Sequence, residues 1–164
     1  YKNTINIDVI GDSTVGDFTD SNIINKGINI RSKNNNKLSY SANSRNLKVS
    51  RDITFEGLYI QNNNIDYPYF LETVEDSVTI NFINCTIEYS NLGKYLVKAA
   101  PNCTINFINC NFVTPTETTG EFKIVYSEGT KVFMSNTTFQ SGYTYSEENF
   151  LNEDGTLTTR VVIV

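Results

Sequence analysis

A repeat of 25 residues is the feature that most constrains the fold of this 164-residue chain. The segment VTINFINCTIEY begins at Val78, and the near-copy CTINFINCNFVT begins at Cys103. Weaker copies begin at Thr4, Gly27, Ile53 and Lys131. A fixed period in the range of about 20–50 residues is typical of solenoids, whose rungs stack on one another and share a core. The spacing predicts about six rungs of roughly 23–28 residues, with a seventh beginning at Val161.

Each copy contains short stretches in which apolar and polar residues alternate, as in Thr79–Phe82 and Thr104–Phe107. This period of two is typical of strands with one buried face. A second alternating stretch follows Asn84 and Asn109, and a third apolar cluster lies before each copy. These third clusters are Tyr69–Leu71, Tyr95–Val97, Lys123–Tyr126 and Phe150–Leu151. Three strands per rung predict an all-β fold, a right-handed parallel β-helix or β-solenoid. We expect one domain over residues 1–164, cut from a longer protein.

The bend between the last two strands of a rung recurs at one position in the repeat. That position holds Gly57, Asn84, Asn109 and Asn136, which are residue types that accept left-handed backbone geometry. We expect a one-residue corner with stacked, inward-facing amides, an asparagine ladder. The next inward row is predicted to be Ile60, Ile87, Phe112 and Phe139.

Composition excludes several classes of function. The chain carries a formal net charge of -5, which argues against nucleic acid as a partner. Its lack of histidine removes Ser-His-Asp and Cys-His catalysis and His-ligated zinc. No apolar stretch approaches the roughly 18 residues of a membrane span, so none is expected in this segment.

The rungs ITFEGLYIQNN, VTINFINCTI and CTINFINCNF resemble the pectate-lyase-like superfamily of parallel β-helices. In their Asn-, Ile- and Thr-rich style they are most similar to adhesin-like surface proteins of gut archaea and bacteria, and next to phage tailspike shafts. The resemblance implies the fold more than an activity, because the superfamily holds lyases, hydrolases, adhesins and inert shafts. The NTD, DD, GHG and RIK signatures of polygalacturonases are missing, as is the Asp cluster that holds calcium in pectate lyases.

An enzyme of this superfamily would cleave a polysaccharide with acids on the face of the first strand row. Glycoside hydrolysis requires two carboxylates about 5–9.5 Å apart, a separation that stacked outward residues could provide. Glu72 and Lys98 are the weak catalytic candidates, because we expect them on adjacent rungs of one row. They could transfer protons or simply form a cross-strand ion pair. The missing signatures favour a non-catalytic chain.

Tyrosines provide the candidates for carbohydrate binding. Tyr67 and Tyr69 flank a proline in one bend, and Tyr143 and Tyr145 lie in another. Their rings could stack on sugar faces while their hydroxyls form hydrogen bonds. Alternatively, they could cover the apolar flank of a rung or contact another subunit.

Three cysteines and three glycosylation sequons have simple structural interpretations. We expect Cys85, Cys103 and Cys110 to be core thiols, with a Cys85–Cys110 disulfide as the alternative.

Sequons begin at Asn84, Asn102 and Asn136. The inward amides expected of Asn84 and Asn136 leave Asn102 as the plausible acceptor.

Charged residues suggest two weaker sites. No cofactor is predicted, although a residual calcium site involving Asp66, Asp76 or Asp154 stays open. A basic stretch near the N-terminus could be solvated loops or could contact an anionic glycan or a neighbouring domain. Its members are Arg31, Lys33, Lys37, Arg45, Lys48 and Arg51.

These observations predict a non-catalytic module of an extracellular, cell-surface adhesin-like protein that binds a polysaccharide or cell-surface glycan. The alternatives are a polysaccharide lyase or glycoside hydrolase, and the shaft of a phage tailspike or tail fibre. A tailspike would place the chain in a virion tail and favour a trimer; the sequence leaves the oligomeric state open.

Overall fold

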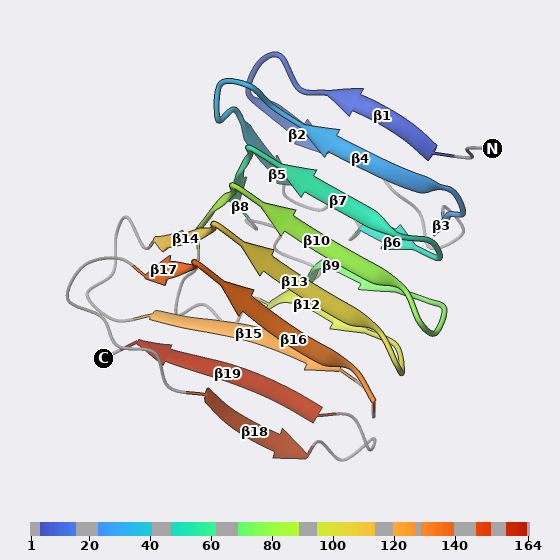
Figure 1. The fold of residues 1–164 in the computed structure, drawn as a ribbon, viewed down its shortest axis with the longest axis vertical. Coiled ribbons are helices and arrows are strands. Elements are labelled where there is room, and N and C mark those ends of the chain that lie inside the picture. The colour runs from blue at the N-terminus through green and yellow to red at the C-terminus, as the bar shows by residue number, and fades with distance from the viewer. Residues whose placement is uncertain are drawn as a thin grey trace.

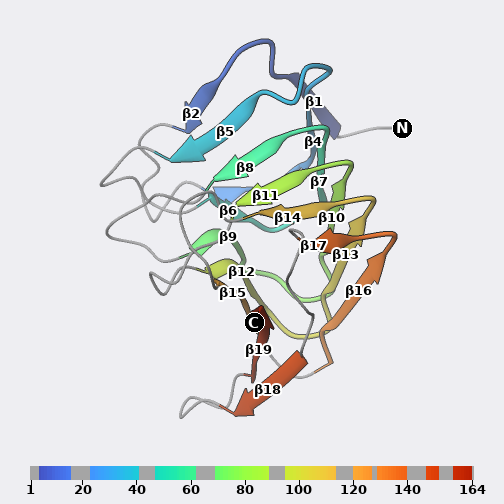
Figure 2. The same ribbon diagram turned by 90° about the vertical axis from the view of Figure 1, so that its left-hand side faces the viewer.

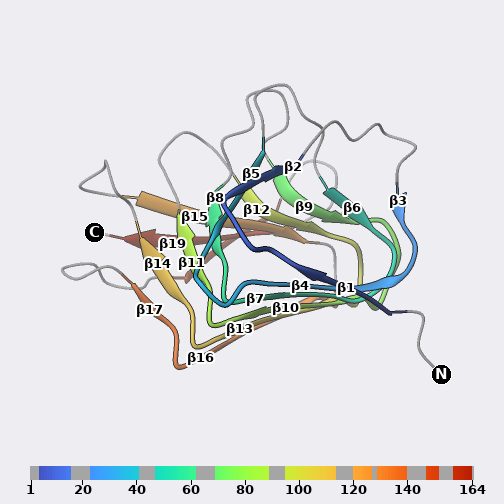
Figure 3. The same ribbon diagram turned by 90° about the horizontal axis from the view of Figure 1, so that it is seen from above.

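The computed structural model describes residues 4–15, 23–40, 47–61, 69–88, 95–113, 120–126, 129–139, 147–151 and 157–163. These segments contain strands and no helix, and they wind into a parallel β-solenoid (Figure 1). Consecutive strands along the chain go to three different sheets in turn, as the view down the stack shows (Figure 3). The all-β class and the three strands per rung are therefore confirmed.

Sheet A contains six strands, all parallel. In stacking order they are β1 (Thr4–Asp8), β4 (Gly27–Arg31), β7 (Ile53–Glu56), β10 (Thr79–Ile83), β13 (Thr104–Ile108) and β16 (Lys131–Ser135). Sheet B also contains six parallel strands. They are β2 (Ser13–Val15), β5 (Lys37–Tyr40), β8 (Tyr59–Gln61), β11 (Thr86–Glu88), β14 (Asn111–Val113) and β17 (Thr138–Phe139).

Sheet C contains seven strands, and unlike the other two sheets it ends in antiparallel strands on the side that holds the C-terminal residues. Its parallel strands are β3 (Ile23–Ile24), β6 (Leu47–Val49), β9 (Tyr69–Thr73), β12 (Tyr95–Ala99) and β15 (Gly120–Tyr126). Two further strands, β18 (Glu147–Leu151) and β19 (Leu157–Ile163), continue the sheet in antiparallel pairing (Figure 2).

The expected seventh rung at Val161 is therefore wrong. Val161 lies in β19, which pairs antiparallel with β15 and so reverses the chain direction instead of adding a parallel turn. Phe150 and Leu151, expected in a further parallel strand, lie in β18, which pairs antiparallel with β19. A hairpin can close a sheet with one tight reversal, whereas a parallel neighbour needs a full rung of chain. The stack is therefore slightly shorter than six to seven rungs.

The core runs along the stack as rows of like residues. Ile53, Ile80 and Ile105 lie on successive strands of sheet A and are fully buried. Two residues further along each strand, the rings of Phe55, Phe82 and Phe107 stack with centroids 5.1 and 5.0 Å apart. Because neighbouring strands of a sheet come from successive repeats, each inward residue packs against the equivalent residues of the preceding and the following rung.

Candidate functional site

The predicted catalytic pair lies on the outward row of sheet C. Glu72 on β9 and Lys98 on β12 are direct partners in the parallel register, as the repeat predicts. On the other side of Glu72 the partner is Lys48. Glu72 thus stands between two lysines rather than beside a second acid, and this alternation of charge is the arrangement of a cross-strand ion-pair row.

Among the four candidate tyrosines, the structure describes only Tyr69, and Tyr67, Tyr143 and Tyr145 lie outside the described residues. Tyr69 begins β9 and is half-buried. The Lys98 ammonium lies 5.5 Å from the centroid of its ring, within the range of a cation–π contact. One candidate tyrosine and one candidate lysine therefore share a contact between β9 and β12, two neighbouring strands in the middle of sheet C.

The bend row has left-handed geometry at all four predicted positions. The φ angles are 67° at Gly57, 53° at Asn84, 52° at Asn109 and 47° at Asn136. Asn136 Nδ2 donates a hydrogen bond of 2.7 Å to Asn109 Oδ1, so amides do pair across rungs in this row.

The expected inward direction of these amides is wrong, since the asparagines of the row are exposed. Phe82 and Cys85 occupy the buried positions on either side of the corner, which leaves the corner residue between them at the surface. The sequon asparagine Asn84 is therefore at the surface. So is Asn102, with φ of 58° in the bend before β13.

All three cysteines are buried and free. The Cys110 thiol donates to the carbonyl oxygen of Phe82 on the neighbouring rung, with a sulfur–oxygen distance of 3.2 Å. The neighbouring Cys110 thiol, and then the burial of the site, raise the pKa of the Cys85 thiol. These thiols occupy core positions as predicted, and the alternative Cys85–Cys110 disulfide is not formed.

The charged candidates are dispersed. Within the described residues, no group of three or more acidic or cysteine side chains could hold a metal ion. Asp76 lies exposed in the turn after β9, and Asp66 and Asp154 lie outside the described residues. In the basic stretch, Arg31 ends β4 of sheet A and Lys37 begins β5 of sheet B, while Lys48 is in β6 of sheet C. The stretch is thus divided among three sheets, and Arg45 is not described.

The outer face of sheet A carries a polar row that the sequence reasoning missed. We call Asn6, Asn29, Thr54, Asn81 and Asn106 the amide column; they are successive partners on β1, β4, β7, β10 and β13. Asn29 donates to Asn6 Oδ1 at 3.0 Å, Asn81 to Thr54 Oγ1 at 3.2 Å and Asn106 to Asn81 Oδ1 at 2.9 Å. The alternation of inward and outward residues predicts an outward side chain at Asn81 and Asn106, and the recurrence of a polar residue at this position once in each repeat was the signal for the column.

An exposed aromatic ring follows the amide column. Phe133 on β16 is the register partner of Asn106 and is 54% exposed. Beside this row, the outward positions hold Thr79, Thr104 and Lys131. In the view from above, the strands of sheet A lie along one side of the molecule with no described element outside them (Figure 3). The outer face of sheet A thus combines threonine hydroxyls, asparagine amides and the exposed ring of Phe133.

Sheet B carries a second polar cluster on its outer face. Tyr59 Oη donates to Glu88 Oε2 at 2.8 Å, and Gln61 Nε2 donates to both oxygens of the same carboxylate, at 3.0 and 3.1 Å. The Lys37 ammonium lies 5.4 Å from the centroid of the Tyr59 ring. Burial, and then the hydrogen bond and charge of Glu88, raise the pKa of Tyr59 to about 12. The Glu88 carboxylate thus accepts hydrogen bonds from two side chains of the neighbouring strand, which ties β8 to β11. We call Tyr59, Gln61 and Glu88 the sheet B clamp.

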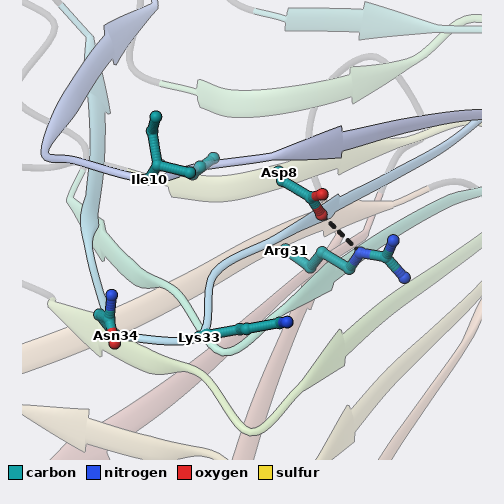
Figure 4. A pocket seen from close by; sticks show the side chains of 6 residues that line it. Asp8, Ile10, Arg31, Lys33 and Asn34 are labelled. Carbon is teal, nitrogen blue, oxygen red and sulfur yellow. Dashed lines mark hydrogen bonds and ion pairs between the residues drawn. The ribbon is translucent and has the colours of Figure 1, made fainter.

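At the N-terminal end of the stack, two hollows adjoin each other. A pocket of about 180 Å³ is lined by Asp8, Arg31, Lys33, Asn34 and their neighbours (Figure 4). Arg31 Nε donates to Asp8 Oδ1 at 2.7 Å, and this contact lowers the pKa of Asp8 and raises that of Arg31. The second hollow, of about 310 Å³, is lined mainly by isoleucine and leucine residues of the first two turns.

No protein family, curated protein or solved structure matches this chain. In the part of the chain that the structure describes, no helix has the length and apolar character to cross a membrane.

Proposed function

We propose that this chain is a non-catalytic β-solenoid module that binds a glycan through the outer face of sheet A. The observation that carries the proposal is the position of Phe133, an exposed ring that directly continues the column of Asn81 and Asn106. Carbohydrates are recognised by this combination, because a ring packs on the apolar face of a sugar while amides bond its hydroxyls.

The amide column retains capacity for a ligand. An asparagine amide has two N–H donors, and the hydrogen bond along the column uses one of them at Asn81 and one at Asn106. Each of these amides can therefore donate its second N–H to a sugar hydroxyl. Neighbouring strands lie about 4.8 Å apart, so successive donors are spaced for an extended chain that runs along the stack.

The setting proposed for this module is an extracellular, cell-surface protein of the adhesin-like kind, within the pectate-lyase-like superfamily. The regular repeats and the sequence resemblance support it. A tailspike shaft remains the alternative for a non-catalytic solenoid, and it predicts a trimer, which sedimentation equilibrium would detect.

A polysaccharide lyase or glycoside hydrolase is the second candidate function, favoured by the register of Glu72 with Lys98. The lysines on both sides of Glu72 weigh against the hydrolase, because retaining and inverting glycosidases need a second carboxylate. A lyase would instead use Lys98 as its base. Reducing-end and unsaturated-product assays on uronate and neutral polysaccharides, with and without calcium, test this candidate. Product formation that Glu72→Gln abolishes would replace the binding proposal.

A glycan array followed by titration of the best ligand tests the binding proposal. We expect Phe133→Ala to weaken binding by at least about tenfold, because stacking on an exposed ring contributes on the order of 1.5 kcal/mol. Ile10→Ala is the matched control, since Ile10 is 91% exposed at the other end of the stack. Equal losses in both variants, or no glycan bound by the wild type, would contradict the proposal.

A further inference from the structure

Asn84 lies at an outer edge of the solenoid, in the corner where β10 of sheet A passes into β11 of sheet B (Figure 2). Its side chain is exposed, while the next residue, Cys85, is buried. Thr86 begins β11 and is half-buried on the outer face of that sheet. The asparagine and the hydroxyl that define the sequon Asn84-Cys85-Thr86 are therefore both on the outside of the folded chain.

The neighbours of Asn84 in the bend row leave space beside its amide. On the preceding rung this position holds Gly57, which has no side chain, and on the following rung it holds Asn109. Asn109 uses its Oδ1 to accept a hydrogen bond from Asn136. Among the described residues, none forms a hydrogen bond with the Asn84 side chain. A group attached to Asn84 Nδ2 therefore breaks no hydrogen bond, and no side chain of the preceding corner obstructs it.

The asparagines of the other two sequons are engaged by neighbouring rungs. Asn136 Nδ2, the atom to which a glycan would be joined, donates a hydrogen bond of 2.7 Å to Asn109 Oδ1. The side-chain oxygen of Asn102 lies against the backbone of Gly129, where an added Cβ would collide with it. A glycan on Asn136 would crowd the bond along the row, and a glycan on Asn102 would have to displace its amide from Gly129. Asn84 has neither obstacle.

The order of synthesis makes the sequon accessible before its corner is fixed. The backbone N–H of Asn84 donates to the carbonyl oxygen of Ile108 on the following rung, at 2.9 Å. Because Ile108 is synthesised later, the backbone of Asn84 lacks this partner while the chain emerges. A transferase can then bind the sequon in an extended conformation, and the next rung folds over the modified corner afterwards.

We propose that Asn84 is a site of N-glycosylation. The donor is an oligosaccharide linked to a lipid diphosphate: the bond between its anomeric carbon and the diphosphate oxygen breaks, and that carbon forms a bond to Asn84 Nδ2, which loses a proton. The products are the glycosylated asparagine, the free lipid diphosphate and the proton. The inference rests on the extracellular setting of the proposed function, because this modification belongs to secreted proteins, and it is independent of glycan binding at Phe133.

Secretion of the chain from a eukaryotic host tests the site. With a leader sequence that directs every molecule into the secretory pathway, site-resolved mass spectrometry of the folded fraction should find a glycan on Asn84, at higher occupancy than on Asn136 or Asn102. Asn109 is the internal control, because it shares the left-handed corner but has Asn111 in place of the sequon hydroxyl. An unmodified Asn84, higher occupancy at Asn102, or a glycan on Asn109 would overturn the proposal.

Two substitutions remove the sequon in different ways. Asn84→Gly removes the acceptor and keeps a residue suited to positive φ, and Thr86→Val keeps the shape of the side chain and removes the hydroxyl. Both variants should lose the glycan mass at this corner. A glycan that persists in Thr86→Val, or one confined to aggregated wild-type protein, would contradict the site.

The design separates this inference from the proposed function. The leader sequence sets the compartment, so an unmodified Asn84 counts against the site itself and leaves the Phe133 surface untouched. Conversely, a glycosylated chain that binds no ligand on the glycan array would contradict the proposed function and leave the modification of Asn84 standing.

Discussion

The first turn and the middle turns of the solenoid contain the same triplet with different outcomes. Thr4-Ile5-Asn6 in β1 and Thr79-Ile80-Asn81 in β10 have the same residues in the same strand positions. Ile5 is 43% exposed, and Ile80 is fully buried. Burial in this fold therefore comes from the turns above and below, and the local sequence determines only which face a side chain occupies.

The comparison is tested most strongly by the same substitution at both positions. Ile80→Ala should lower the free energy of unfolding by about 2–5 kcal/mol, because it leaves a cavity between Ile53 and Ile105. Ile5→Ala should cost about 1 kcal/mol or less, since part of the side chain is already in water. Urea denaturation measures both. Equal costs would mean that the first turn is as well packed as the middle.

The bend row gives the next largest contrast. A Cβ at Gly57 would approach the Ser32 carbonyl oxygen, so Gly57→Asn should cost about 1–3 kcal/mol even though asparagine accepts positive φ. The reverse change, Asn84→Gly, keeps the left-handed bend and should alter stability by less than about 0.5 kcal/mol. Denaturation curves that rank the two variants in the opposite order would show that backbone geometry alone governs this row.

The sheet B clamp predicts a smaller, pH-dependent effect. Tyr59→Phe should cost about 1 kcal/mol at neutral pH, because Glu88 loses one hydrogen bond and keeps those from Gln61. The pKa of Tyr59 is raised to about 12 in the folded protein, above the ordinary value of 10.0. Its contribution is therefore fully present below pH 10 and is lost between about pH 10 and 12.

The measurement is the difference in the free energy of unfolding between the wild type and Tyr59→Phe, taken across this pH range. Because both proteins contain the other tyrosines and the lysines, the titration of those groups cancels in the difference. The wild type should lose more stability than the variant as pH rises. A constant difference would place Tyr59 in contact with solvent rather than with Glu88.

The exposed ion pair of the first turn should give the smallest effect. Asp8→Asn removes the contact with Arg31, but both side chains are at least half exposed, so stability should not change measurably. A clear loss that disappears in high salt would show that the first turn depends on charge to compensate for its thin core.

Much of the interior could be predicted from the repeat, because equivalent residues of successive repeats become partners on neighbouring strands. Ile60, Ile87 and Phe112 form the predicted inward row of sheet B, and Phe139 continues it. The partnership of Glu72 with Lys98 followed from the same alignment. Each of these predictions needed only equivalent positions and the alternation of strands.

The remaining features depend on three-dimensional details that the repeat leaves open. Equivalent positions in the repeat identified the corner at Asn84 but not the exposure of its side chain, which depends on Phe82 and Cys85 filling the core on either side of it. The antiparallel pairing of β19 with β15 replaces a parallel turn where the repeat fades. The contact of Tyr59 with Glu88 spans neighbouring rungs, and it required the side-chain geometry of sheet B.

Methyl-labelled NMR tests the stacking of turns most directly. With isoleucine methyl groups labelled and assigned by Ile→Val variants, Ile80 should give nuclear Overhauser effects to both Ile53 and Ile105, its partners on β7 and β13. Ile53 and Ile105 should give none to each other, because β10 lies between them. Contacts of Ile80 with neither residue, or a direct contact between Ile53 and Ile105, would contradict the parallel solenoid.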